Sequence, residues 1–374
     1  MNLMRDLRKR GRLLSIGLVV TGMGFGPGCM RPDQGRASQI RGHVPELRLT
    51  RTIPLPGVGG DGGSSGMPGR FDHFAYDAGT HRLFVAAVAN GSLEVIDLDK
   101  AVRVKSIGGL GHPQGVAVAA TIGLAIVACG SEGAIRAYDT QTLEEKGRLE
   151  IGEDPDNVRF VAGHLYVGYG PETAGAIVTI DPKPLRRISE MPLKAHPESF
   201  QLTPDGRRVF VNIPWSKRSD IDGSVVAGDL EAGKVESTWT LAQTARNFPM
   251  ALDVERERVF VASRKPAKLV CLNSKTGQVI SEAPCAPDSD DIYRDPNTGH
   301  LIVIGGGDRE KPGSDGAIDV FSVGGIGKLD RIATVTTAPM ARTGYFSADR
   351  RAVYVAVPAK DGRDAEIREY TLVD

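Results

Sequence analysis

The sequence predicts an all-β fold in which one structural unit repeats until the C-terminus. The clearest copy runs from Arg70 to Ile107, where four short segments of alternating residues are separated by turn residues such as Asn90-Gly91. Four short antiparallel strands in about 40 residues correspond to one blade of a propeller. Because one such unit leaves much of its apolar surface exposed, several copies must pack around a common axis.

Strand-like segments recur along the chain at intervals of about 40 to 50 residues, the range expected for propeller blades. The second strand of each unit is expected at LFVAA (from Leu83), LAIVA (Leu124), LYVGY (Leu165), VFVNI (Val209), VFVAS (Val259), LIVIG (Leu301) and VYVAV (Val353). Each is followed by a third strand, so the count predicts seven blades. No long stretch shows sustained helical periodicity.

The two ends of the repeat region are incomplete in complementary ways. The last unit stops after its third strand at Asp374, whereas the strand-like segment Glu46 to Gly57 belongs to no unit of its own. If this segment becomes the outer strand of the last blade, two exposed strand edges disappear at once. We therefore predict a seven-bladed β-propeller closed by an N-terminal strand.

The composition excludes some classes of partner. The chain has 46 basic and 46 acidic residues, a formal net charge of zero, and 41% hydrophobic residues. This balance does not favour nucleic acid or an anionic membrane surface as a partner. The 46 glycines and 23 prolines suit a fold with many tight turns.

The N-terminal segment has the pattern of an export signal. Basic residues from Arg5 to Arg12 precede the apolar run Leu13 to Val20, which is too short to span a bilayer, and a small-residue run leads to Cys29. We assign residues 1–29 to a signal, 30–44 to a linker and 45–374 to the propeller, and expect an extracytoplasmic location in the periplasm or cell envelope. A disordered basic tail is the alternative.

Membrane attachment through Cys29 is left open by the same segment. Cys29 resembles a lipoprotein acceptor, but Gly26-Pro27-Gly28 lacks the aliphatic residue usual three positions before that cysteine. The other cysteines, Cys129, Cys271 and Cys285, are expected to be buried free thiols. No C-x-x-C-H motif is present, so a covalently attached haem is not encoded.

The recurrent pattern L-F-V-A-x…G-x-[LI]-x-V-I-D-L resembles the YVTN-type seven-bladed propeller repeat family, over residues 45–374. Stretches such as FDHFAYD, DPDNVRF and HPESFQL are similar to a subgroup of that family whose role is not known. The resemblance implies the propeller fold and an extracytoplasmic, surface-layer-like protein. It implies no particular activity, because propellers include hydrolases, oxidoreductases and binding platforms.

Aligning the units predicts which side chains meet where the first strands enter the central channel. The aligned pairs are Asp72-His73, Gln114-Gly115, Asp156-Asn157, Glu198-Ser199, Pro249-Met250, Asp290-Asp291 and Arg342-Thr343. Most of these residues are polar, at positions where packing would tolerate small apolar side chains. The predicted binding residues are Asp72, His73, Asp156, Asn157, Glu198, Arg264, Lys265, Asp290, Asp291 and Arg342.

Two interpretations of this ring remain open. Carboxylates around one narrow opening repel each other unless a cation is present, so Asp156, Asn157 and Asp290 are candidate ligands of a Ca²⁺ or Mg²⁺ ion, the cofactor such oxygen atoms prefer. Alternatively, Arg342, with Arg264 and Lys265, neutralises the carboxylates in a structural ion-pair network.

Candidate acid–base groups are His73, His196 and Glu198. His196 also precedes a proline and therefore has a simpler explanation as a turn residue. The sequence contains no G-x-S-x-G motif and no P-loop, and Gly305-Gly306-Gly307 runs into a charged turn-rich loop. These absences favour a binding protein over an enzyme.

The function we favour is that of an exported, monomeric binding or scaffold propeller that holds a protein or a small polar ligand at its polar rim. Two long insertions, Pro214 to Gly223 with Trp215 and Gly305 to Gly316, are either partner-binding loops or variable solvated loops. The alternative function is a metal-dependent hydrolase of lactones or similar esters that uses the carboxylate ring. Such a site would resemble that of a gluconolactonase-type lactonase only as a distant analogue, because the two do not match residue by residue.

Overall fold

The computed structural model describes residues 46–59, 69–214 and 222–373. The expected signal, linker and Cys29 lie outside these ranges, as do Trp215 and most of the first insertion. In the described part of the chain, no helix has the length and apolar character needed to cross a membrane.

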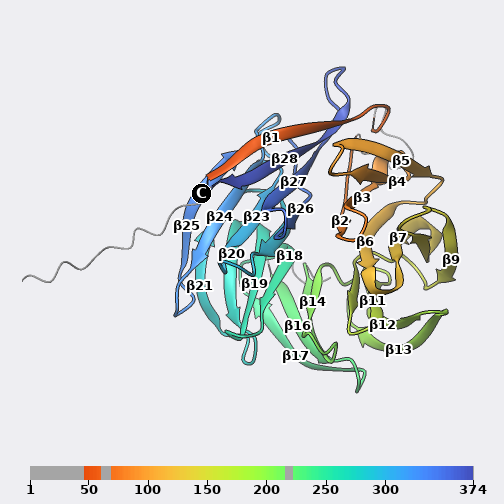
Figure 1. Ribbon diagram of the computed structural model, residues 1–374. Coiled ribbons are helices and arrows are strands. Elements are labelled where there is room, and N and C mark those ends of the chain that lie inside the picture. The colour runs from red at the N-terminus through yellow and green to blue at the C-terminus, as the bar shows by residue number, and fades with distance from the viewer. Residues whose placement is uncertain (1–45, 60–68, 215–221, 374) are drawn as a thin grey trace, which may run out of the picture. The chain divides into compact units, whose positions relative to one another are not determined.

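The described strands form seven sheets of four strands each, arranged in a ring around a central channel (Figure 1). Blades 1 to 3 contain β2 (Phe74–Asp77), β3 (Arg82–Ala87), β4 (Ser92–Asp97) and β5 (Val102–Gly108); β6 (Pro113–Ala119), β7 (Leu124–Cys129), β8 (Ala134–Asp139) and β9 (Glu145–Glu150); β10 (Val158–Val161), β11 (His164–Tyr169), β12 (Gly175–Pro182) and β13 (Leu185–Leu193). Short 3-10 helices occur at η2 (Val88–Asn90), η3 (Ala120–Ile122) and η4 (Gly130–Glu132).

Blades 4 to 7 complete the ring. They contain β14 (Phe200–Leu202), β15 (Arg208–Ile213), β16 (Gly223–Asp229) and β17 (Lys234–Leu241); β18 (Ala245–Asp253), β19 (Arg258–Lys265), β20 (Ala267–Asn273) and β21 (Val279–Pro284); β22 (Ser289–Arg294), β23 (Leu301–Gly305), β24 (Ala317–Val323) and β25 (Leu329–Thr336); and β26 (Gly344–Ser347), β27 (Ala352–Val357), β28 (Ala365–Val373) and β1 (Glu46–Leu55). The predicted all-β propeller is confirmed.

Ring closure follows the prediction. Strand β1 pairs antiparallel with β28, from Glu46 opposite Val373 to Leu55 opposite Ala365, with one irregularity after Leu49. In Figure 1 the N-terminal strand β1 lies alongside the C-terminal β28. The first and last described segments of the chain therefore share one blade, which leaves no open edge between the last unit and the first.

The hydrophobic core is divided among the interfaces between neighbouring blades. Each of the seven clusters in the described residues combines side chains from two adjacent blades, and the cluster at the closure joins Ile53 and Tyr354 of blade 7 to Phe74 and Leu83 of blade 1. The second strands are buried over almost their whole length, as in RLFVAA of β3, because they contact a blade on each face. In the outer strands, as in β5, exposed residues are interspersed with half-buried ones.

Two smaller predictions concern turns and thiols. The expected Asn90-Gly91 hairpin contains the 3-10 turn η2 and Gly91 at φ 61°, a left-handed conformation that glycine adopts without strain. Cys129, Cys271 and Cys285 are buried and free, as expected. Burial raises the pKa of Cys129 and of Cys285 to about 12, so these thiols have little thiolate character.

Replacing Ile53 by Ala should lower the free energy of unfolding by about 2–5 kcal/mol, because the side chain is fully buried at the closure. Leu49→Ala is the matched control on the same strand, since Leu49 is 51% exposed. Chemical denaturation of both variants measures the difference. Equal stability losses would contradict the role of β1 in closing the ring.

Candidate functional site

A repeated backbone turn places the ring residues. In five blades a residue other than glycine adopts a left-handed conformation two positions before the residue that faces the channel entrance. The turn residues are His112, Asp154, Arg246, Asp288 and Met340, with φ between 47° and 65°, and the residues that follow by two are Gln114, Asp156, Phe248, Asp290 and Arg342. Such conformations are uncommon for residues other than glycine, although Asp and His adopt them more often than most. The turn therefore directs one side chain per blade toward a common cavity.

Backbone hydrogen bonds and one close approach fix these positions. The amides of Asp72, Asp156 and Glu198 donate to carbonyls of the adjoining second strand, at 2.9, 2.9 and 3.0 Å. A Cβ at Gly115 would lie 2.0 Å from the carbonyl oxygen of Asp156, so only glycine lets the two blades approach here. The ring residues thus lie on rigid elements.

The cavity at this end of the channel has a volume of about 330 Å³. Eight of the ten predicted binding residues line it, namely Asp72, His73, Asp156, Asn157, Glu198, Arg264, Asp290 and Arg342. Asp291 lines a second cavity further along the first strands, and Lys265 lines neither. The alignment erred by one residue in blade 5, where Phe248 lines this cavity and Pro249 lines the second one.

One side of the cavity is an ion-pair network. Asp290 is bound by Arg342 at 2.7 Å and by Arg264, whose guanidinium lies 4.0 Å from the centre of the Phe248 ring. Asp288 contacts Arg264, Arg309 and Arg342 at 3.1, 2.8 and 3.4 Å. Burial alone would raise the pKa of Asp290, but the two arginines outweigh it and lower this pKa. Asp290 is thus engaged by arginines.

His73 lies between two carboxylates. Its ring nitrogens are 3.6 Å from Asp72 and 3.4 Å from Asp291. Burial disfavours the charged imidazole, but the hydrogen bond to Asp291 and the nearby carboxylates outweigh it and raise the pKa of His73 to about 10. His73 is therefore protonated near neutral pH and is poorly suited to act as a general base.

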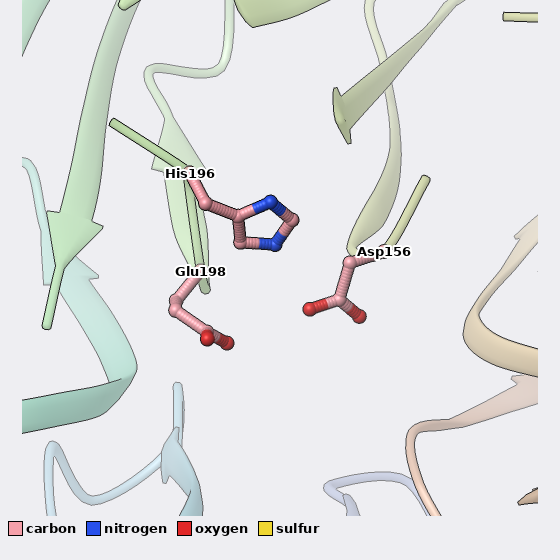
Figure 2. Close-up of side chains that lie close together, drawn as sticks. All are labelled: Asp156, His196 and Glu198. Atoms are coloured by element: carbon pink, nitrogen blue, oxygen red, sulfur yellow. The ribbon is translucent and has the colours of Figure 1, made fainter. Parts of the chain in front are cut away.

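Asp156 and Glu198, on the other side of the cavity, take part in none of these ion pairs. Figure 2 shows both carboxylates turned toward the same space as His196, and one ligand atom from each of the three side chains lies within 4.8 Å of the others. Asp156 is 8% exposed, and its Oδ1 atom is buried without a hydrogen-bond partner in the described structure. Burial and mutual repulsion raise the pKa of Asp156 to about 8, and burial with repulsion from Asp290 raises that of Glu198 to about 8.

The orientation of His196 leaves one ring nitrogen available. Its Nδ1 atom lies within hydrogen-bond distance of the carbonyl oxygen of Gly170. A carbonyl only accepts, so Nδ1 carries the hydrogen and Nε2 of the neutral ring has a free lone pair. Metal-binding histidines are commonly held in this way. The Oδ1 atom of the adjacent Asn157 is also buried and without a partner in the described structure.

The charges around the cavity favour a cation. In the part of the chain that the structure describes, its lining includes seven carboxylate side chains and three arginines. Two of the arginines are engaged with Asp288 and Asp290, and the third, Arg70, binds Asp72 at 2.7 Å. The carboxylates left over are concentrated near Asp156, where a positive charge would relieve their repulsion.

Several residues of the site were not predicted from the sequence. Arg70 immediately precedes the FDHF stretch, and Asp288 begins the DSDD stretch, so both were next to residues that the alignment selected. Arg309 reaches Asp288 from the insertion between Gly305 and Gly316, a contact that no repeat alignment contains. Glu153, Asp154 and Glu172 also line the cavity. The position of His196 beside Asp156 depends on the loop geometry of two different blades.

Comparison with solved structures supports the fold. The chain is similar to a chain of the hydrazine synthase of Kuenenia stuttgartiensis, with a TM-score of 0.66 and 15% sequence identity over 76% of this chain and 91% of that chain. It is also similar to a chain of a mitotic checkpoint complex, with a TM-score of 0.68 and 12% identity over 96% and 99%. Identities this low show a shared fold alone. No family model and no curated protein matches the sequence, so the YVTN-type resemblance stays a prediction.

The raised pKa values predict how stability changes with pH in metal-free solution. Between the ordinary values of 3.8 and 4.5 and about 8, Asp156 and Glu198 hold protons that the unfolded chain releases. Their contribution to stability therefore falls as pH rises through this window. Asp156→Asn and Glu198→Gln should each reduce the loss of stability that accompanies rising pH. Each should stabilise the protein near pH 8 by about 1 kcal/mol or more.

Thermal melting across the pH series, in the presence of a chelator, measures this effect. Asp205→Asn is the control, because Asp205 is exposed, hydrogen-bonded to Thr203 and remote from the channel. If the wild type, the two cluster variants and the control variant all gave parallel pH profiles, the two buried carboxylates would be ionised in the folded state, which would contradict the prediction.

Proposed function

We propose that this propeller is a binding protein that holds a divalent cation at the channel entrance and, through that cation, a small polar ligand. The observation that carries the proposal is the cluster of Asp156, His196 and Glu198, whose ligand atoms lie within 4.8 Å of one another beside an unpaired, buried carboxylate oxygen. The N-terminal sequence pattern supports an exported protein, and the YVTN-type resemblance supports the same location.

The chemistry of the cluster favours a transition metal. An imidazole nitrogen with two carboxylates suits Zn²⁺ or Mn²⁺ better than Ca²⁺, which prefers a shell made of oxygen atoms. Asn157 lines the same cavity, and its side-chain oxygen is buried without a hydrogen-bond partner in the described structure. Asp290, a candidate ligand in the sequence prediction, is engaged by Arg264 and Arg342 and is not needed for this set.

The cavity also supports binding of a polar ligand next to the cation. Arg70 has a buried Nε atom without a hydrogen-bond partner in the described structure. A ligand with an anionic group could contact both the cation and this donor. A cavity of about 330 Å³ suits a small molecule, within the usual range for ligand pockets.

We expect the chelator-treated protein to bind one Mn²⁺ or Zn²⁺ ion in isothermal titration calorimetry, and His196→Ala and Glu198→Gln to weaken this binding at least about tenfold. His300→Ala is the control, because His300 lines neither cavity of the channel. Unchanged binding in the cluster variants would overturn the site. Ca²⁺ binding that is insensitive to His196→Ala would instead favour the oxygen-only set.

A second candidate function is hydrolysis of lactones or similar esters. The observation that favours it is the number of protein ligands in the cluster, because three ligands leave a coordination position for water, as in catalytic zinc sites. His73, held protonated by Asp72 and Asp291, would then stabilise negative charge on the substrate.

If this second function is correct, a screen of lactones and esters should find turnover that requires Mn²⁺ or Zn²⁺ and falls at least about a hundredfold in Glu198→Gln. His300→Ala should retain the activity. Metal binding without turnover of any substrate would favour the binding function, whereas turnover in the chelated protein would exclude a metal mechanism.

A further inference from the structure

A second cavity lies further along the channel, past the ring residues. Its volume is about 270 Å³, and its walls are formed by the first strands of the blades. It shares only His73 and Ser199 with the cavity at the channel entrance. Its chemistry is different, because aromatic and apolar side chains replace most of the carboxylates.

Three tyrosines from three blades form one side of this second cavity. Tyr345 of β26 lies 6.1 Å from Tyr76 of β2 and 5.6 Å from Tyr293 of β22, measured between ring centres. Phe160 and Met250 add further apolar surface. Aromatic faces and edges arranged in this way accept another flat ring by offset or edge-to-face contact.

Arg159 of β10 is the only arginine among the described residues that line the second cavity. Its guanidinium donates to the carbonyl of Val158 at 2.8 Å and to the hydroxyl of Ser199 at 3.3 Å, and it lies 5.5 Å from the centre of the Phe200 ring. None of these partners carries a negative charge. A guanidinium has five N–H donors, so most of its capacity remains for a ligand.

Among the described residues, Asp291 is the one carboxylate that lines this cavity, and it does not neutralise Arg159. Asp291 accepts from the amide of Gly344 at 2.9 Å and lies 3.4 Å from His73, and no carboxylate in the described residues forms an ion pair with Arg159. The site therefore combines an aromatic wall with a positive charge that has no anionic partner. This is the opposite of the acidic cluster at the channel entrance.

We infer that the second cavity binds a small aromatic carboxylate, with the carboxylate on Arg159 and the ring against Tyr345 and its neighbours. Arginine pairs with carboxylates through two parallel hydrogen bonds, which would orient such a ligand. The cavity is large enough for a single ring with small substituents. This inference does not depend on the cation site, because the two cavities use different charged groups.

Benzoate is the probe that tests the inference, in calorimetric titrations of the full chain. We expect benzoate to bind, and we expect benzamide, which has the same shape without the charge, and acetate, which lacks the ring, to bind at least about tenfold more weakly. Because benzoate could also coordinate a metal at the channel entrance, the titration is repeated with Asp156→Asn in chelator. Binding should be unchanged there. Loss of binding in Asp156→Asn would assign benzoate to the entrance and overturn the inference.

Variants of Arg159 test whether the carboxylate of the ligand binds to this side chain. Arg159→Met should weaken benzoate binding at least about tenfold, and Arg159→Lys, which keeps the charge, should weaken it less. Arg208→Met is the matched control, since Arg208 lies 5.2 Å from the Phe210 ring but pairs with Glu236 outside the cavity. Tyr345→Leu tests the aromatic wall independently. Equal affinity of Arg159→Met and wild type, or no binding to wild type at millimolar benzoate, would overturn the inference.

Discussion

The pairing of β1 with β28 is the constraint on which the rest of the structure depends. It joins the two ends of the described chain in one blade and creates the hydrophobic cluster between blades 7 and 1. The same closure brings Arg70 and Asp72 of blade 1 into one cavity with Arg342, which precedes the first strand of blade 7. The candidate site is therefore a property of the closed ring, and an open arc of the same blades would not assemble it.

Within that ring, some buried carboxylates are paired with arginines and others are not. Asp288 and Asp290 are surrounded by arginines, so their burial is compensated by charge pairing. Asp156 and Glu198 are held close together without such partners, and both keep protons that a surface carboxylate would lose. Uncompensated, perturbed carboxylates in a cavity are typical of functional sites.

The sequence predicted the fold because the information was local and repeated. Turn residues and alternating segments recur in each unit, and the unpaired segment at the N-terminus identified the closure without any long-range knowledge. The ring of channel residues followed from the same repeat. The error at Phe248 is not explained by the irregularity of β18, because the first strands of blades 2 and 6 have the same kind of irregularity and were aligned correctly. Blade 5 has an apolar residue at the ring position, whereas the other six blades have a polar one, so the pattern gave no signal there.

The finer chemistry of the site could not be read in the same way. Which arginine binds which aspartate depends on side-chain reach across blades, as in the contact of Arg309 with Asp288. The orientation of the His196 ring depends on a hydrogen bond to Gly170, a residue in the loop of the preceding blade. Sequence reasoning treated His196 mainly as a turn residue, and both descriptions apply, because the turn before Pro197 is what carries the imidazole toward Asp156.

The channel as a whole has a polarity that neither cavity shows alone. The entrance collects carboxylates around Asp156, whereas the second cavity presents Arg159 to an aromatic wall. His73 lies at the boundary and is bound to Asp72 on the entrance side and to Asp291 on the other. The imidazole of His73 therefore links the two cavities, which share this residue and Ser199. Along one channel the described structure places a cavity rich in carboxylates next to one with an arginine and an aromatic wall.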